Sequence, residues 1–225
     1  FLANYFTGRY AMSDARGVDF MIDEASGESR TSGSAASLAG IETAIASKQP
    51  ARLDWAVDRY LCAYAMVFGF GGIPLLYMGD EIGMLNDPSY LKDAAKAEDN
   101  RWLHRPAMDW RTANKAASGE IPEKAAGRIR DGISHLIATR KRIDSLHASV
   151  STKVIAGKGH GVVIFERRHP AGNMVQVYNL SHTSRWVNRS ELEAVGDKPI
   201  EELTGYEWDI AQGIEIQPYQ VLWFR

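Results

Sequence analysis

A short, almost uninterrupted apolar run constrains the fold of this chain more than any other feature. Residues 73–79 read Ile-Pro-Leu-Leu-Tyr-Met-Gly, and a glycine stands at each end of the run. Such a run is typical of a strand that is buried on both faces of a parallel sheet, and a helix extension or an edge strand are the alternatives that the pattern leaves open. A parallel strand needs parallel neighbours from further βα units, and the chain contains one such segment. The sequence therefore predicts the end of a larger α/β architecture.

Helices are predicted on both sides of this run. Apolar residues recur with the period of a helix over 53–70 and again over 125–144. Residues 1–48 are rich in Gly, Ser and Ala, and they predict a short helix followed by irregular loops. Residues 80–122 are polar and carry several turn signals, which is typical of a loop that is either functional or disordered.

The hydrophobic period changes from helical to about two after His147. Short apolar segments separated by turn residues predict a small antiparallel β-sandwich. The segments are 154–155, 162–165, 174–178, 184–187, 207–210, 213–216 and 219–224. The expected fold class is α/β plus β, with a domain boundary near residue 148.

Charge and cysteine content exclude several kinds of partner. The 225 residues hold 26 Lys and Arg against 28 Asp and Glu, so we expect neither nucleic acid nor a membrane as a partner. Cys62 is the single cysteine, which excludes an intrachain disulfide, and we expect a buried structural thiol with no metal and no cofactor. The first residues, from Phe1, lack the pattern of a targeting peptide, so a cytoplasmic location is favoured and further sequence is expected before them.

Several segments together resemble a known enzyme family. Residues 72–81 resemble the segment that covers the eighth barrel strand in glycoside hydrolase family 13, the α-amylase family. Residues 85–87, 99–106 and 217–223 are similar to amylosucrases and to the closely similar sucrose hydrolases. Residues 1–18 and 27–33 also match the insert that amylosucrases carry after their seventh strand.

The resemblance implies the last repeat of a (β/α)8 TIM barrel followed by a C-terminal antiparallel β-sandwich. Residues 1–48 would be the remainder of the insert, 49–148 the end of the barrel with helix, strand eight and helix, and 149–225 the sandwich. The family cleaves glycosidic bonds with retention, using an Asp nucleophile, a Glu acid/base and a second Asp. Amylosucrases release fructose from sucrose and transfer glucose to an α-1,4-glucan, so sucrose and α-glucan are the implied substrates.

No segment of this chain matches the motifs that carry those three carboxylates. The chain alone is therefore expected to be inactive, and the exposed apolar face of an incomplete barrel would favour association. A sucrose hydrolase or an α-amylase-type hydrolase of the same family remains an alternative. A non-catalytic carbohydrate-binding or assembly module is a further one.

The resemblance also assigns roles to individual residues. Arg101 matches an arginine at the floor of the glucose pocket that pairs with an aspartate from an early barrel strand. Arg30 matches an arginine that lines the acceptor subsites. Asp99 and His104 belong to the motif around Arg101, and both would support the pocket together with Asp80.

Two carboxylates and three tryptophans are further candidates for contact with a ligand. Asp80 and Glu81 look like an acid/base pair at a strand end, but neighbours on a strand point to opposite faces, so we expect them to anchor a loop as hydrogen-bond acceptors. The tryptophans in the predicted sandwich could stack on sugars, although core positions are the more common role of such residues. They are Trp186, Trp208 and Trp223.

Overall fold

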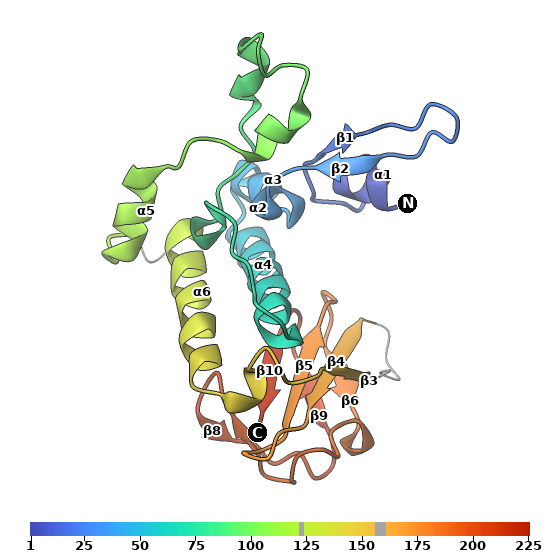
Figure 1. Ribbon diagram of the computed structural model, residues 1–225, viewed down its shortest axis with the longest axis vertical. Helices are drawn as coiled ribbons and strands as arrows, with labels where there is room; N and C mark the ends of the chain where they lie inside the picture. The colour runs from blue at the N-terminus through green and yellow to red at the C-terminus, as the bar shows by residue number, and fades with distance from the viewer. Residues whose placement is uncertain (122–123, 156–160) are drawn as a thin grey trace. The chain divides into compact units, whose positions relative to one another are not determined.

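The computed structural model describes residues 1–121, 124–155 and 161–225 (Figure 1). It divides the chain into two compact units that do not follow chain order. The first unit comprises residues 1–60 and 76–130, and the second comprises residues 61–75 and 131–225. The predicted division at residues 48 and 148 concerns the complete protein and stays a prediction.

The first unit contains a β-hairpin and short helices. The hairpin joins β1 (Val18–Phe20) and β2 (Arg30–Ser32), with Phe20 directly opposite Arg30. The helical elements are α1 (Leu2–Phe6), α2 (Ala35–Leu38), α3 (Ile41–Ser47), η1 (Asp80–Ile82), η2 (Pro88–Lys92), η3 (Asn100–His104) and α5 (Trp110–Ala117). The short helix at the start is confirmed, but the irregular loops predicted up to residue 48 are partly wrong, because three-residue strands are too short to show a period.

Both long helices are confirmed. The first, α4, spans Pro50–Phe70, and it begins at the proline because a first-turn position needs no backbone N–H donor. The second, α6, spans Ala125–Lys141 and stops short of the predicted end at residue 144, where a separate 3₁₀ turn, η4 (Asp144–Leu146), follows.

The apolar run itself differs from the prediction. In the described chain, residues 73–77 form no strand, and α4 ends before them, so neither the buried parallel strand nor the helix extension is present. Ile73 is 90% exposed and Leu75 is 79% exposed. The physical reason is the missing ladder: a parallel strand is held by its neighbours, and all strand pairs among the described residues are antiparallel.

The second unit contains an antiparallel β domain. A six-stranded sheet has the order β3-β4-β5-β10-β7-β8, and a separate ribbon pairs β6 with β9. The strands are β3 (Lys153–Ile155), β4 (Val162–Arg167), β5 (Met174–Asn179), β6 (Arg185–Val187), β7 (Ile200–Glu201), β8 (Tyr206–Glu207), β9 (Ile214–Ile216) and β10 (Val221–Phe224). A further 3₁₀ turn, η5 (Arg189–Glu191), precedes β7. One apolar core, which includes Ile164, Val177 and Phe224, joins side chains from the sheet and the ribbon.

Most of the predicted strands in this domain are confirmed, with two differences. The strand predicted over 207–210 ends at Glu207, because the N–H groups of Trp208 and Ile210 donate to loop carbonyls. The two-residue strand β7 was not predicted, because it is too short to show a period and includes Glu201. That carboxylate is fully buried and accepts the N–H groups of Trp223 at 2.9 Å and Thr204 at 2.8 Å.

Arg167 is the most unusual core residue of the β domain. Its side chain is fully buried on β4, and all its hydrogen bonds within the described chain go to neutral oxygens. Nε donates to the carbonyl of Ser145 at 2.6 Å, Nη1 to that of Phe70 at 2.7 Å, and Nη2 to those of His147 and Val150. Burial lowers the pKa of Arg167. The guanidinium thereby fixes the end of α4 and the segment before β3 to the sheet.

The expectation for Cys62 is also met by the structure. Its thiol is buried on α4, and burial raises its pKa to about 12, so the thiolate is absent at neutral pH.

Candidate functional site

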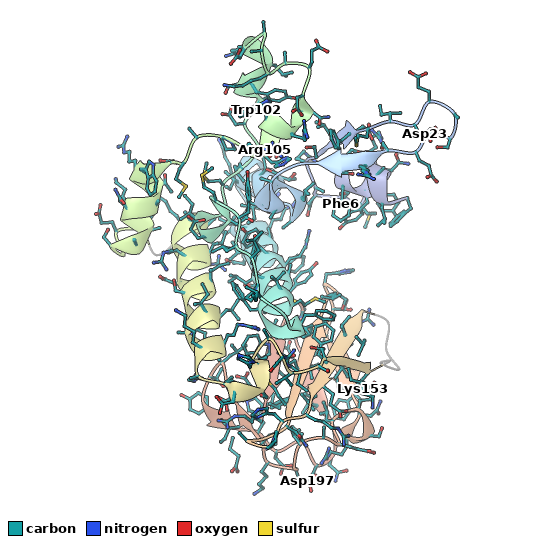
Figure 2. All side chains as sticks on the ribbon, in the orientation of Figure 1. Phe6, Asp23, Trp102, Arg105, Lys153 and Asp197 are labelled. Atoms are coloured by element: carbon teal, nitrogen blue, oxygen red, sulfur yellow. The ribbon has the colours of Figure 1, made fainter. Side chains whose placement is uncertain are left out.

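The β1-β2 hairpin and the turn η3 come together in the first unit. The hydroxyl of Ser32 lies 3.0 Å from His104 Nδ1 and donates to the carbonyl of Asn100 at 3.3 Å. The Asn100 side chain donates in turn to the carbonyl of Asp19 on β1. Figure 2 shows Trp102 and Arg105 in the η3 region, beside the hairpin whose distal turn carries Asp23. Two segments about 70 residues apart thus form one surface.

The turn η3 is held by an aspartate cap. Asp99 precedes it in an extended conformation, and its carboxylate accepts the N–H of Arg101 at 3.0 Å. Aspartate is common at the N-cap of a helical turn, because its carboxylate accepts a backbone N–H that has no partner within the turn. The backbone N–H of Asp87 donates to the carbonyl of Leu103 at 2.8 Å and joins η3 to the preceding segment.

Asp99 and Arg101 also form a bidentate ion pair. Arg101 Nε lies 2.8 Å from Asp99 Oδ1, and Nη2 lies 2.7 Å from Oδ2. The side-chain hydrogen bonds from Arg101, and then its backbone N–H, lower the pKa of Asp99 to about 2. Half of the Arg101 side chain remains exposed. The guanidinium is therefore oriented by a local carboxylate and still open to a ligand.

Phe20 connects the two predicted substrate-binding arginines. The Arg101 guanidinium carbon lies 5.8 Å from the centre of the Phe20 ring, within the range of a cation–π contact. Arg30 stands directly opposite Phe20 in the hairpin, and directly opposite residues of an antiparallel pair share one face. The exposed Arg30 side chain also approaches Met21 Sδ at 4.0 Å. Both arginines therefore neighbour Phe20, Arg101 through its guanidinium and Arg30 through its cross-strand pairing.

His104 is the partly buried member of the cluster. Desolvation, and then the charge of Arg105, lower the pKa of His104 below its ordinary value. A neutral imidazole suits the Nδ1 contact with the Ser32 hydroxyl, because a neutral ring nitrogen can donate or accept there. The contact of His104 with Ser32 joins the hairpin to η3, and its support of a substrate pocket stays a prediction.

Asp80 and Glu81 lie on η1, another element of the same unit. The expectation that they lie at a strand end with side chains on opposite faces is wrong, because both are in a 3₁₀ turn. Glu81 Oε2 accepts the N–H of Gly79 at 2.8 Å, and the carbonyl of Asp80 accepts the Tyr60 hydroxyl at 2.7 Å. These bonds anchor the turn after the apolar run.

Sequence reasoning missed the residues that connect the site. Phe20 contacts Arg101 and pairs with Arg30, and Asn100 joins η3 to β1, but no periodicity marks either residue. Asn86 is similar: its side chain accepts the N–H of Ser34 at 2.8 Å and donates to the carbonyl of Arg16. The available signal was the composition of residues 85–87 and 99–106, where side-chain amides stand next to aspartates in a polar segment.

Two further properties bear on ligand class. Within the described ranges, no three His, Cys, Asp or Glu side chains gather closely enough to hold a metal ion. In the same part of the chain, no helix has the length and apolar character that a membrane span requires. Arginines, an aromatic ring and hydroxyl or amide groups are the polar and apolar groups that this surface offers to a ligand.

The β domain matches a known protein family. Residues 153–225 match the family described as amylosucrase, C-terminal domain. The matched range begins at the first residue of β3 and ends at the last residue of the chain.

Solved structures share the fold of most of the chain. AmyP in complex with maltose has a TM-score of 0.60 at 16% identity, over 84% of this chain and 37% of that one. An Anoxybacillus α-amylase has a TM-score of 0.52 at 17% identity, over 78% and 34%. A MutB mutant in complex with the substrate sucrose has a TM-score of 0.51 at 16% identity, over 73% and 37%. This chain therefore spans little more than a third of the length of these structures.

The long helices and the antiparallel domain after them share their fold with these solved structures, one of which is an α-amylase. Residues 153–225 are similar to the amylosucrase C-terminal domain, and the expected resemblance to the carboxyl-terminal part of an amylosucrase is confirmed for this part of the chain.

Proposed function

We propose that this chain is the carboxyl-terminal part of an amylosucrase-like retaining glucosyltransferase. The complete protein would cleave sucrose, release fructose and transfer the glucosyl group to an α-1,4-glucan. The observation that carries the proposal is that Arg30 and Arg101 both neighbour Phe20, in a chain whose β domain matches the amylosucrase C-terminal family.

The two arginines would bind different sugars during the reaction. Arg101, oriented by Asp99, would hydrogen-bond the terminal glucose, and Arg30 would bind hydroxyls of the acceptor glucan. Guanidinium groups suit this task because their several donors point in fixed directions. Asp99 and His104 would support the geometry.

The reaction itself would use carboxylates that lie outside this chain. A carboxylate nucleophile forms a covalent bond to the anomeric carbon while the bond to fructose breaks, and the acid/base residue gives its proton to the departing oxygen. The acid/base residue then takes a proton from the glucan hydroxyl that attacks the intermediate. Retention of configuration follows from these two displacements.

We also propose that residues 73–77 become the eighth strand of a (β/α)8 barrel in the complete protein. Their exposed apolar side chains are the feature expected of a strand without its neighbours. Residues 1–48 would then belong to the insert before this strand, and residues 149–225 to the β domain after the barrel.

Sucrose turnover by the complete protein tests the proposal. We expect fructose to appear in excess over free glucose, together with a growing α-1,4-glucan, and we expect no fructose from the 225-residue chain. Equal release of glucose and fructose would indicate a sucrose hydrolase instead. Absence of fructose from the complete protein would contradict the proposal, and activity of the short chain would contradict the placement of the carboxylates outside it.

A further inference from the structure

The ribbon formed by β6 and β9 has an apolar inner face and an exposed outer face that carries an aromatic ring and polar side chains. Val187, Ile214 and Ile216 point into the core and are at most 5% exposed. Side chains alternate along a strand, so the residues between them point outward. On the outer face, Trp186 stands directly opposite Glu215.

Trp186 is the exception among the three tryptophans of this domain. Trp223 is fully buried and Trp208 packs against the core, whereas Trp186 is 54% exposed. Glycine is required beneath it: a Cβ added at Gly213 would lie 3.0 Å from the indole ring and 2.6 Å from the carbonyl of Val187. The backbone at Gly213 also has φ +94°, a conformation that favours glycine. The indole is thus supported by main chain on one side and open to solvent on the other.

Polar side chains stand beside this ring. The pairing of Arg185 with Ile216 continues to Ser184 and Gln217, which lie on the same outward side as Trp186 and Glu215. The Ser184 hydroxyl donates to Gln217 Oε1 at 3.3 Å. Ser184, Glu215 and Gln217 are all exposed. A hydroxyl, an amide and a carboxylate therefore surround one flat apolar surface.

We propose that this outer face of the β6-β9 ribbon binds α-glucan chains, through residues distinct from the Arg30 and Arg101 cluster. The C–H faces of a glucose ring would stack on the Trp186 indole, and sugar hydroxyls would bond to Glu215, Gln217 and Ser184. The choice of α-glucan as the ligand rests on the proposed function. Such a surface would hold a polymeric acceptor near the enzyme between successive transfers.

The composition of the face favours a sugar over a protein partner. Trp186 is its one large apolar side chain within β6 and β9, which is far less than a stable protein interface buries. An aromatic ring among neutral and acidic hydrogen-bonding groups fits a neutral ligand rich in hydroxyls.

Affinity electrophoresis of the 225-residue chain in gels with and without glycogen tests the site. We expect glycogen to retard the wild-type chain and Trp186→Ala to bind about tenfold more weakly, as loss of one stacked indole predicts. Trp186→Tyr keeps a flat ring and should retain most of the retardation. Tyr206→Ala is the matched control, because Tyr206 is an aromatic of the same domain that is 72% exposed.

Three results of this experiment would contradict glycogen binding at Trp186. Equal retardation of wild type and Trp186→Ala, or no retardation of wild type, would overturn the proposal. If Trp186→Ala changed the sedimentation of the chain and left glycogen binding unchanged, the face would contact another copy of the chain. That result would also overturn the proposal. Because glycogen binding needs no sucrose cleavage, failure of this site and failure of the proposed reaction are distinguishable.

Discussion

At the scale of single residues, Arg101 is the side chain on which the proposed reaction depends most. Its position is fixed by a carboxylate only two residues away, so the local sequence determines its orientation. In the complete protein, Arg101→Ala is expected to lower kcat/KM for sucrose about 10- to 100-fold, since hydrogen bonds from a charged group contribute roughly 1.5–3 kcal/mol. Initial rates of fructose release measure this effect.

Arg111→Ala is the matched control for Arg101, because Arg111 is an exposed arginine on the nearby helix α5. We expect its rate to equal that of the wild type. A normal rate in the Arg101 variant would remove this residue from the substrate pocket.

Arg30 is expected to act at a different stage of the reaction. The Arg30→Ala variant of the complete protein should release fructose at close to the wild-type rate but form shorter glucan products and more free glucose. The reason is that an acceptor contact affects which molecule intercepts the glucosyl intermediate and leaves the first cleavage unchanged. Chromatography of the products measures chain length, and an unchanged distribution would argue against the acceptor role.

The residues of the candidate site were only partly predictable. Arg30, Asp99, Arg101 and His104 could be named because they lie in segments that resemble amylosucrases. Phe20 could not, since its role comes from pairing with Arg30 across a hairpin too short to show alternation. Contacts between distant segments are set by tertiary structure, which sequence patterns do not report.

At the scale of elements, predictability followed length. The helices α4 and α6 repeat their apolar period over several turns, and their ends were located within a few residues. Among the short elements, β7 and the β1-β2 hairpin carry no period and were missed, whereas the equally short strands β3, β6 and β9 were predicted from apolar segments between turn residues. The apolar run at 73–77 shows the opposite error, because its composition is that of a buried strand but its pairing depends on neighbours.

The contact between α4 and the sheet of the β domain predicts whether Gly69→Ala raises or lowers the free energy of unfolding. Gly69 lies in α4, where alanine normally stabilises a helix by about 1 kcal/mol relative to glycine. Here an added Cβ would lie 2.1 Å from the Tyr178 hydroxyl and 2.5 Å from Gln176 Nε2, and both side chains are fully buried. Because such overpacking costs about 1–3 kcal/mol, Gly69→Ala is expected to destabilise the β domain by up to about 2 kcal/mol.

Urea unfolding followed by tryptophan fluorescence measures this change for Gly69→Ala. Gly196→Ala serves as the control, since an added Cβ there meets no atom within 4 Å, and its stability should stay within about 0.5 kcal/mol of wild type. A stabilised Gly69 variant would show that α4 does not pack closely on Tyr178.

At the scale of the whole molecule, the exposed apolar run should determine how the chain behaves in solution. Ile73 and Leu75 present apolar side chains to solvent in a segment that forms no strand among the described residues, and such exposed apolar surface favours association between copies. We expect the 25.0 kDa chain to sediment as larger species that increase with concentration. The double substitution Ile73→Ser and Leu75→Ser should shift the distribution toward monomer.

Leu91→Ser is the control for association, since Leu91 is 59% exposed but lies on η2, away from the apolar run in sequence. It should leave sedimentation unchanged. A monomeric wild-type chain at all concentrations would mean that the run is covered in solution, against the proposed role as an unpartnered barrel strand.

The buried guanidinium of Arg167 has a consequence for the kinetics of folding. It bonds to the carbonyl of Phe70, 97 residues earlier in the chain, as well as to carbonyls just before β3. Contacts of such sequence separation form late, because the loop they close must lose its conformational freedom first. We therefore expect the β domain to complete its folding only after α4 has formed. A fragment that begins at residue 149 lacks the carbonyls of Phe70, Ser145 and His147, and its urea midpoint should fall well below that of the same domain in the longer chain.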